Sequence, residues 1–321
     1  MTRRLLIVAA GLALISVPLW VGNNYYVNIA SQILIYAVFA LGLNVLVGYA
    51  GLVSLGHAGL FGVGCYAAAW LLAGGSGHLA AALVAVLVIL ATSAAFAVLS
   101  LRTTGIGFVM ITLALGQILW GLAYRWIGLT GGDNGINVPS RPAPFGLSLA
   151  SAAPFYEFTL IVFALAVISM AVLVASPFGA SLKGTRDQPR RMTALGYNVW
   201  LIRFLAFLFS GFWSGVAGLL FCYFNEFVSP NVLALSSSAE VLLMVISGGS
   251  GTLLGPIAGA GLVVIMKNVA SAYIERWNFV LGAIFVAIVI FMPEGLVPGS
   301  VRLWRWLRAG SRRLPVRGGV P

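Results

Sequence analysis

The chain has 321 residues, of which 61% are hydrophobic and 8% are charged, and its formal net charge is +11. Soluble domains carry roughly 25% charged residues, so a buried core alone does not explain this composition. The apolar runs are continuous rather than alternating, which excludes a transmembrane β-barrel and predicts an all-α polytopic membrane protein.

Apolar stretches follow one another along most of the chain. The first runs from Leu5 to about Val21 after Arg3-Arg4. We interpret it as an uncleaved helix, and a cleaved signal peptide is the alternative. At a rise of 1.5 Å per residue, each later stretch is about long enough for one crossing. They lie at about 29–47, 52–73, 79–101, 106–127, 158–175, 202–225, 240–267 and 277–291.

Basic residues set the expected orientation, because cytoplasmic loops collect Lys and Arg. Counting crossings from Arg3 places Arg102 and the polar segment 176–200 in the cytoplasm and segment 128–157 outside. The basic tail reaches the cytoplasm only if one stretch crosses twice or not at all, and 240–267 is the candidate. Its middle, Ser247–Pro256, is rich in glycine. We therefore expect about eight to ten transmembrane helices, with broken or re-entrant Gly-rich segments.

The tail, residues 301–321, contains six arginines between Arg302 and Arg317, beside Trp304 and Trp306. Such a charge balance also fits nucleic-acid binding. An apolar, aromatic and basic mixture is more typical of an anchor on anionic membrane lipid, so we expect lipid contact and no nucleic-acid partner.

Two glycine clusters recur at an offset of 200 residues: Gly48, Gly51 and Gly59, then Gly248, Gly251 and Gly259. Small residues allow close helix packing. The alternative is a duplicated transporter, built as an inverted repeat, whose opened helices face the substrate. That interpretation predicts a substrate path near Ser54, Gly56, His57, Gly248, Gly249 and Gly251.

Two polar residues within apolar stretches are open to two interpretations. His57 is either a structural histidine with internal partners or a residue of the substrate pathway. Glu240 either completes a capping box with Ser237 as N-cap or contacts a substrate or ion, and we favour the capping box.

Enzyme chemistry is not indicated. The chain has two histidines and seven scattered acids, with no metal-binding or catalytic spacing. Neither lysine follows the Gly-x-x-x-x-Gly-Lys pattern of a P-loop, so we expect no ATPase site, cofactor or metal. Energy for transport would come from another subunit or an ion gradient.

The segment 176–200 is a polar island between two apolar stretches. Pro189 can occupy the first turn of a helix and Gly196 can end it in the left-handed conformation. We expect a short helix over about 189–195 that presents a basic knob to a partner, and an ordinary basic loop is the alternative.

Four segments resemble, in the same order, LivM-type permeases of branched-chain amino acid ABC transporters. Residues 176–198 are similar to the cytoplasmic coupling loop of that family. The other three segments are Asn44-Val-Leu-Val-Gly-Tyr-Ala-Gly-Leu-Val-Ser-Leu-Gly-His-Ala-Gly-Leu-Phe-Gly62, Thr130-Gly-Gly-Asp-Asn-Gly-Ile136 and Glu240-Val-Leu-Leu-Met-Val-Ile-Ser-Gly-Gly-Ser-Gly-Thr-Leu-Leu-Gly-Pro256.

This resemblance implies a single permease domain over residues 1–300, in the bacterial inner membrane, importing branched-chain or similar hydrophobic amino acids. It also implies two cytoplasmic ABC ATPase subunits, a second, LivH-type permease and a periplasmic amino-acid-binding protein. Many ABC permeases carry a Glu-Ala-Ala sequence ahead of the glycine in this loop. The corresponding residues of this chain, 192–196, contain no glutamate. The residues implied to contact the ATPase are Gly179, Lys183, Arg186, Asp187, Pro189, Arg190, Arg191, Ala194 and Gly196.

Two alternatives remain open. One is a permease for another small zwitterion or amide, such as urea. The other is an ion-coupled secondary carrier, which the scarcity of membrane carboxylates disfavours. Genes for an ATPase and a binding protein beside this gene would favour the importer.

The orientation generates a prediction about the tail. A cysteine introduced as Arg308→Cys should react with a membrane-impermeant thiol reagent only from the cytoplasmic side, because the basic tail stays inside. Labelling in inverted and right-side-out vesicles measures this. Reaction from the outer side would contradict both the crossing count and the expected break in stretch 240–267.

Overall fold

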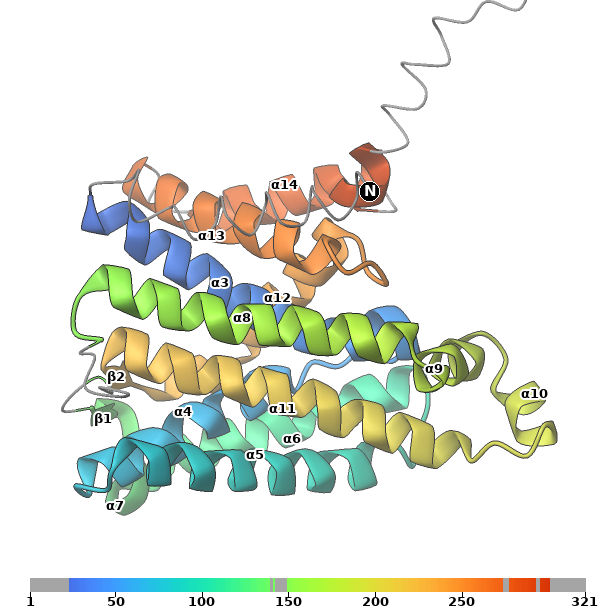
Figure 1. The fold of residues 1–321 in the computed structure, drawn as a ribbon, viewed down its shortest axis with the longest axis horizontal. Helices are drawn as coiled ribbons and strands as arrows, with labels where there is room; N and C mark the ends of the chain where they lie inside the picture. The colour runs from blue at the N-terminus through green and yellow to red at the C-terminus, as the bar shows by residue number, and fades with distance from the viewer. Residues whose placement is uncertain (1–22, 139–140, 142–148, 274–276, 293–294, 301–321) are drawn as a thin grey trace, which may run out of the picture.

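The computed structural model describes residues 23–138, 141, 149–273, 277–292 and 295–300. The expected first helix, at 5–21, and the basic tail lie outside the described residues. The rest is a bundle of helices that run side by side along one axis (Figure 1). This confirms the all-α polytopic membrane fold.

Five described helices are long and apolar enough to cross a membrane. They are α3 (Asn24–Asn44, continued by the π-helix η1, Val45–Ala50), α5 (His78–Ser100), α6 (Ile106–Arg125), α8 (Ala152–Ala175) and α11 (Val199–Asn225). Shorter apolar helices lie among them: α4 (His57–Ala73), α12 (Leu235–Gly248), α13 (Gly255–Tyr273) and α14 (Trp277–Phe291).

The two ends of the bundle differ (Figure 1). The end that we call the island end carries α9 (Pro177–Asp187) and α10 (Pro189–Ala194). At the opposite, strand end, β1 (Ile136–Asn137) pairs antiparallel with β2 (Phe227–Val228), with Ile136 opposite Val228. Short turns complete that end: α7 (Ile127–Thr130) and the 3₁₀ helices η2 (Gly132–Asn134) and η4 (Pro230–Leu233).

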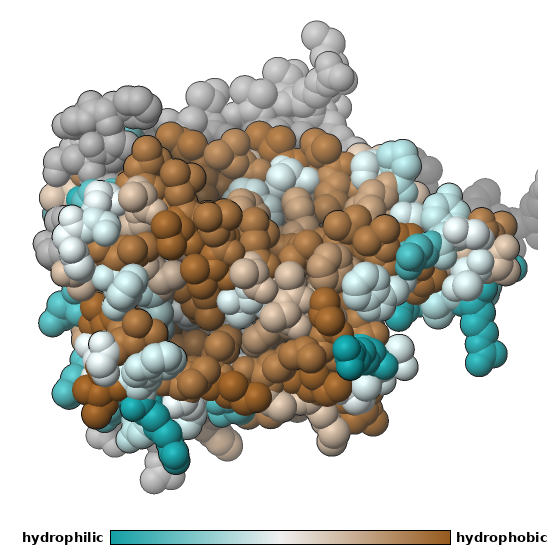
Figure 2. Space-filling view, turned by 90° about the horizontal axis from the view of Figure 1, so that it is seen from below, coloured by the Kyte–Doolittle hydropathy of each residue, from teal (hydrophilic) through white to brown (hydrophobic). Residues whose placement is uncertain are grey.

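Helix α3 lies in the centre of the bundle, in contact with α8, α11, α12 and α13. Its second half is buried almost without interruption. Outer helices instead expose large apolar side chains such as Leu87 and Met110. The face in Figure 2 is accordingly hydrophobic over most of its area, with hydrophilic residues gathered toward its ends. An apolar flank between polar ends is what a bilayer requires.

The expected break in stretch 240–267 is confirmed. Helix α12 ends at Gly248, residues 249–254 are not helical, and α13 returns alongside α12. A second break lies at the first glycine cluster, where opened helices were one of the two interpretations. Stretch 52–73 is irregular over 51–56 and becomes helical only at His57.

A new helix follows α8 directly. Ser176 caps this helix, α9, by accepting a hydrogen bond from the Gly179 amide at 3.3 Å. Pro177 occupies the first turn, where its missing N–H leaves no backbone acceptor unpaired.

The two glycine clusters do not lie at equivalent positions of an inverted repeat. Near the strand end, Glu240 of α12 pairs with Lys267 of α13, and the neighbouring Asn268 binds Gln32 of α3. At their other ends, Gly251 lies against Gly48. Helices α3 and α12 therefore run in the same direction, whereas an inverted repeat would need opposite directions. The offset of 200 residues instead marks two helix ends that meet.

Candidate functional site

Inside the bundle, the π-helical end of α3 meets the non-helical segment between α12 and α13. We call η1 together with residues 249–254 the junction. Asn44, which is 2% exposed, holds it together. Its Oδ1 accepts from the Gly251 amide and its Nδ2 donates to the Thr252 carbonyl, both at 2.9 Å. Backbone groups inside a membrane protein must find partners within the protein. Asn44 supplies two of them where the helices are interrupted.

Close backbone contact at the junction requires glycine. A Cβ on Gly48 would collide with the Gly251 amide and would lie 2.7 Å from the Gly251 Cα. Gly249 and Gly251 have φ angles of +116° and +78°, which other residues rarely adopt. A Cβ on Gly248 would collide with the Gly255 carbonyl. These contacts account for the glycines by packing and backbone conformation.

His57, at the start of α4, is fully buried, and both ring nitrogens have partners. Nδ1 lies 2.8 Å from Ser54 Oγ, and Nε2 lies 2.9 Å from Ser210 Oγ on α11. Because Ser210 donates its own proton to the Gly42 carbonyl at 2.6 Å, it accepts from Nε2–H, and Nδ1 accepts from Ser54. Through these contacts the imidazole ties α4 to α11 and α3.

The turn before His57 is held by neighbouring helices. Ser238 of α12 accepts a hydrogen bond from the Ala58 amide at 3.1 Å, and a Cβ on Gly56 would collide with the Thr112 carbonyl of α6. The structure thus places Ser54, Gly56 and His57 in one buried contact set, and Gly248, Gly249 and Gly251 at the junction. Their role as a substrate path stays a prediction.

The polar island divides into two parts that face different ways. Its first part, α9, is fastened to the junction. Arg186 Nη1 donates to the Gly48 carbonyl at 2.7 Å, and Lys183 Nζ lies 5.5 Å from the centre of the Tyr49 ring. Asp187 accepts from Arg186 Nε at 2.9 Å, and Gly179 packs directly on the last turn of α8. Lys183 and Arg186 therefore contact their own chain.

The second part, α10, projects from the island end (Figure 1). It begins at Pro189 and ends at Ala194, and Gly196 has a φ of +86°, which confirms the short helix expected over 189–195. Met192 is buried against Gly184 of α9. The exposed residues from Arg190 to Gly196 are Arg190, Arg191, Thr193, Ala194, Leu195 and Gly196. This part offers a basic surface that the described residues leave exposed.

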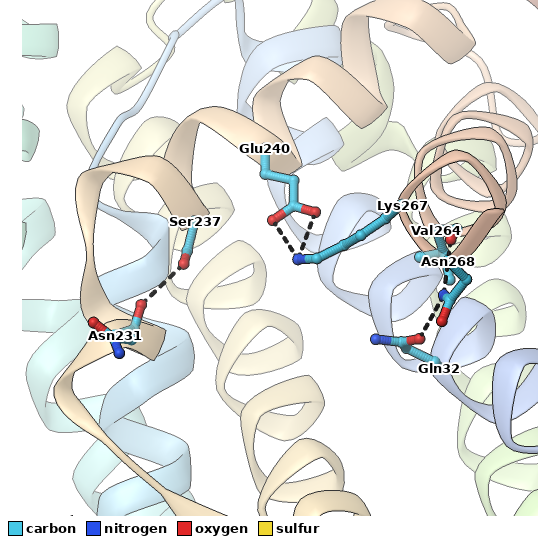
Figure 3. A network of polar contacts seen from close by, with 7 residues as sticks. All are labelled: Gln32, Asn231, Ser237, Glu240, Val264, Lys267 and Asn268. Atoms are coloured by element: carbon cyan, nitrogen blue, oxygen red, sulfur yellow. Dashed lines mark hydrogen bonds and ion pairs between the residues drawn. The ribbon is translucent and has the colours of Figure 1, made fainter. Parts of the chain in front are cut away.

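The capping box predicted for Ser237 and Glu240 is wrong. Helix α12 begins at Leu235 with Ala234 as N-cap, so Ser237 lies inside the helix and donates to the Asn231 carbonyl at 3.1 Å. Glu240 instead pairs with Lys267 of α13, at 3.1 and 3.3 Å (Figure 3). Opposite charges at the two ends of the broken stretch 240–267 were the available signal.

Metal binding has no support in the described residues, where no three His, Cys, Asp or Glu side chains are grouped.

Sequence analysis missed the role of Asn44, whose two partners lie 207 and 208 residues away. A polar residue at the end of a long apolar stretch was the only signal for it.

Comparison with known proteins gives a consistent result. A family model described as branched-chain amino acid transport system / permease component matches residues 25–289. The high-affinity branched-chain amino acid transport system permease protein LivM of Escherichia coli (strain K12) is 30% identical, covering 92% of this chain and 75% of that protein. The same protein of Salmonella typhimurium is 31% identical, covering 85% and 70%.

A more distant similarity covers part of the chain. The autoinducer 2 import system permease protein LsrC of Salmonella typhi is 27% identical over 57% of this chain and 54% of that protein. No solved structure matches.

The junction generates a prediction about stability. Gly48→Ala should lower the apparent Tm of the detergent-solubilised protein, because the added Cβ collides with backbone at Gly251 and overpacking costs about 1–3 kcal/mol. Gly121→Ala in α6 is the control, since no atom lies within 4 Å of its Cβ position. Equal Tm values for the two variants would contradict the proposed close packing.

Proposed function

Because this chain belongs to the family of branched-chain amino acid transport system permease components, we propose that it is a transmembrane subunit of an ABC importer for branched-chain amino acids. In this proposal it carries the amino acid into the cytoplasm across the bacterial inner membrane. The names of the two similar LivM proteins support the substrate class. The chain is a transport subunit and not an enzyme.

The proposed partners follow from the family. Two cytoplasmic ABC ATPase subunits would drive transport, since neither Lys183 nor Lys267 lies in a P-loop sequence. A second, LivH-type permease would complete the membrane unit, and a periplasmic amino-acid-binding protein would deliver the substrate. Anionic lipid would contact the basic tail.

One observation carries the coupling part of the proposal: the island is bonded to the junction. Arg186 of α9 donates to the Gly48 carbonyl in η1, and Asn44, one turn earlier, binds Gly251 and Thr252. A displacement of α9 therefore pulls on both broken segments. π-helical turns such as η1 are rare and frequently occur at functional sites.

A mechanism follows from this chain of contacts. The ATPase pair would bind α10 through its exposed basic residues and move it on closure. Met192 transmits the movement to α9, because it packs against Gly184. Arg186 then shifts η1 against residues 249–254, which changes the angle of α3 and α4 relative to α12 and α13. Irregular segments between rigid helices are suited to act as hinges.

Uptake measurements test the proposal. The wild-type chain, reconstituted with the ATPase, second-permease and binding-protein subunits encoded beside it, should accumulate labelled leucine, isoleucine or valine only in the presence of ATP. If the complex accumulated labelled urea and none of these amino acids, the proposed substrate would be wrong. Accumulation by the chain alone on an ion gradient would replace the importer with a secondary carrier.

Charge reversal tests the role of α10. Arg190→Glu with Arg191→Glu should lower ATP-dependent uptake at least about tenfold, because the two introduced carboxylates would repel an acidic partner surface that the basic pair attracts. Both side chains are exposed, so the amount of protein in the membrane should not change. Arg102→Glu, on the turn between α5 and α6, is the matched control outside the island. Wild-type uptake by the double variant would contradict contact through this pair.

A further inference from the structure

A cavity of about 590 Å³ opens between α3, α11, α12 and α13 in the half of the bundle near the strand end. This volume is in the range of small-molecule sites. One wall is aromatic: Phe61 lies 4.6 Å from Phe39 and 5.2 Å from Phe221 between ring centres, and Tyr36 lies 6.1 Å from Phe221. Four rings from α3, α4 and α11 thus form a continuous apolar surface.

Another part of the cavity wall carries charge. Glu240 of α12 and Lys267 of α13 point toward one another across the gap between their helices (Figure 3). Their side chains are 15% and 32% exposed, and both residues line the cavity. Among the described residues, the other two ion pairs lie at the ends of the bundle, Arg141–Glu226 near the strands and Arg186–Asp187 in the island. A partly buried pair inside the apolar part of a membrane protein is costly and is usually functional.

The ion pair is not needed to hold α12 against α13. These helices already touch backbone to backbone, because a Cβ on Gly259 would collide with the Met244 carbonyl and one on Gly248 with the Gly255 carbonyl. Such small-residue contacts are a sufficient basis for helix association in a membrane. A purely structural role therefore leaves the position of the pair, at the cavity wall, without a reason.

We propose that this cavity binds an α-amino acid zwitterion, with Lys267 holding its carboxylate, Glu240 its ammonium group and the four rings its apolar side chain. The assignment rests on the proposed function and adds the recognition residues. A zwitterion can insert between the two charges and leave each of them paired. A ligand with one charge would bind one member of the pair and lie against the other member, which carries a charge of the same sign as the ligand.

Protection from chemical labelling tests the site in membrane vesicles that contain the full chain with its partner subunits. Ser236 lines the cavity and is exposed, whereas the native Cys65 and Cys222 are buried, so Ser236→Cys introduces one reactive thiol. Leucine should slow its reaction with a maleimide. Leucinamide, which lacks the carboxylate, and 4-methylpentanoate, which lacks the ammonium group, should need at least about tenfold higher concentrations.

Variants of the ion pair assign each charge. Both variants are made in the Ser236→Cys background. Glu240→Gln should remove the preference for leucine over 4-methylpentanoate, because Glu240 holds the ammonium group. Lys267→Met should remove the preference for leucine over leucinamide, because Lys267 holds the carboxylate. Gln32→Leu is the matched control, because it breaks the neighbouring 3.1 Å contact with Asn268 outside the cavity wall. In that variant, leucine should slow the reaction with the maleimide as much as it does in the parent.

The outcomes separate this inference from the proposed function. Equal protection by leucine and both analogues in the parent overturns the inference without any further variant, even when the complex imports leucine. Retained discrimination in both charge variants overturns it as well. Charge-dependent protection by leucine supports the site even in a complex that does not accumulate leucine, in which case the proposed transport function fails alone.

Discussion

Backbone groups in an apolar environment must be satisfied within the protein, and the organisation of this bundle follows from that constraint. Two segments leave regular α-helical bonding inside the bundle: η1 with the irregular residues 51–56 that follow it, and residues 249–254. They are tolerated because they meet each other. Asn44 bonds both a donor and an acceptor of the second segment, and Gly48 lets the backbones touch. Neither interruption would be stable facing lipid.

The junction also explains why the polar island is divided. Arg186 reaches the Gly48 carbonyl, so α9 is part of the bundle, while α10 stays outside with Arg190 and Arg191 exposed. At the opposite half of α12 and α13 lies the cavity with Glu240 and Lys267. The same two helices thus connect the proposed site of ATPase contact, through the junction, to the proposed amino acid site. A movement of one helix pair can affect both.

Sequence reasoning predicted the helices well, because the length of an apolar stretch and the position of basic residues are local properties. The break in 240–267 was also predictable, from glycine content and the parity of crossings. Sequence reasoning failed where a partner distant in sequence determines the role of a side chain. Glu240 was assigned to its own helix end, yet Lys267, 27 residues later, offers a full opposite charge. His57 had two open roles: its contacts with Ser54 and Ser210 show the structural one, and its place on the substrate path stays a prediction.

By itself, then, the sequence determined the class of protein, the succession of apolar helices, the short helix at Pro189 and the family that its motifs resemble. Only the tertiary structure decided which polar groups pair: Asn44 with the backbone at 251–252, Arg186 with Gly48 and Glu240 with Lys267. Hydrophobicity is additive along a chain and can be read from it. Hydrogen bonds and ion pairs depend on distances of about 3 Å, which exist only after the helices have packed.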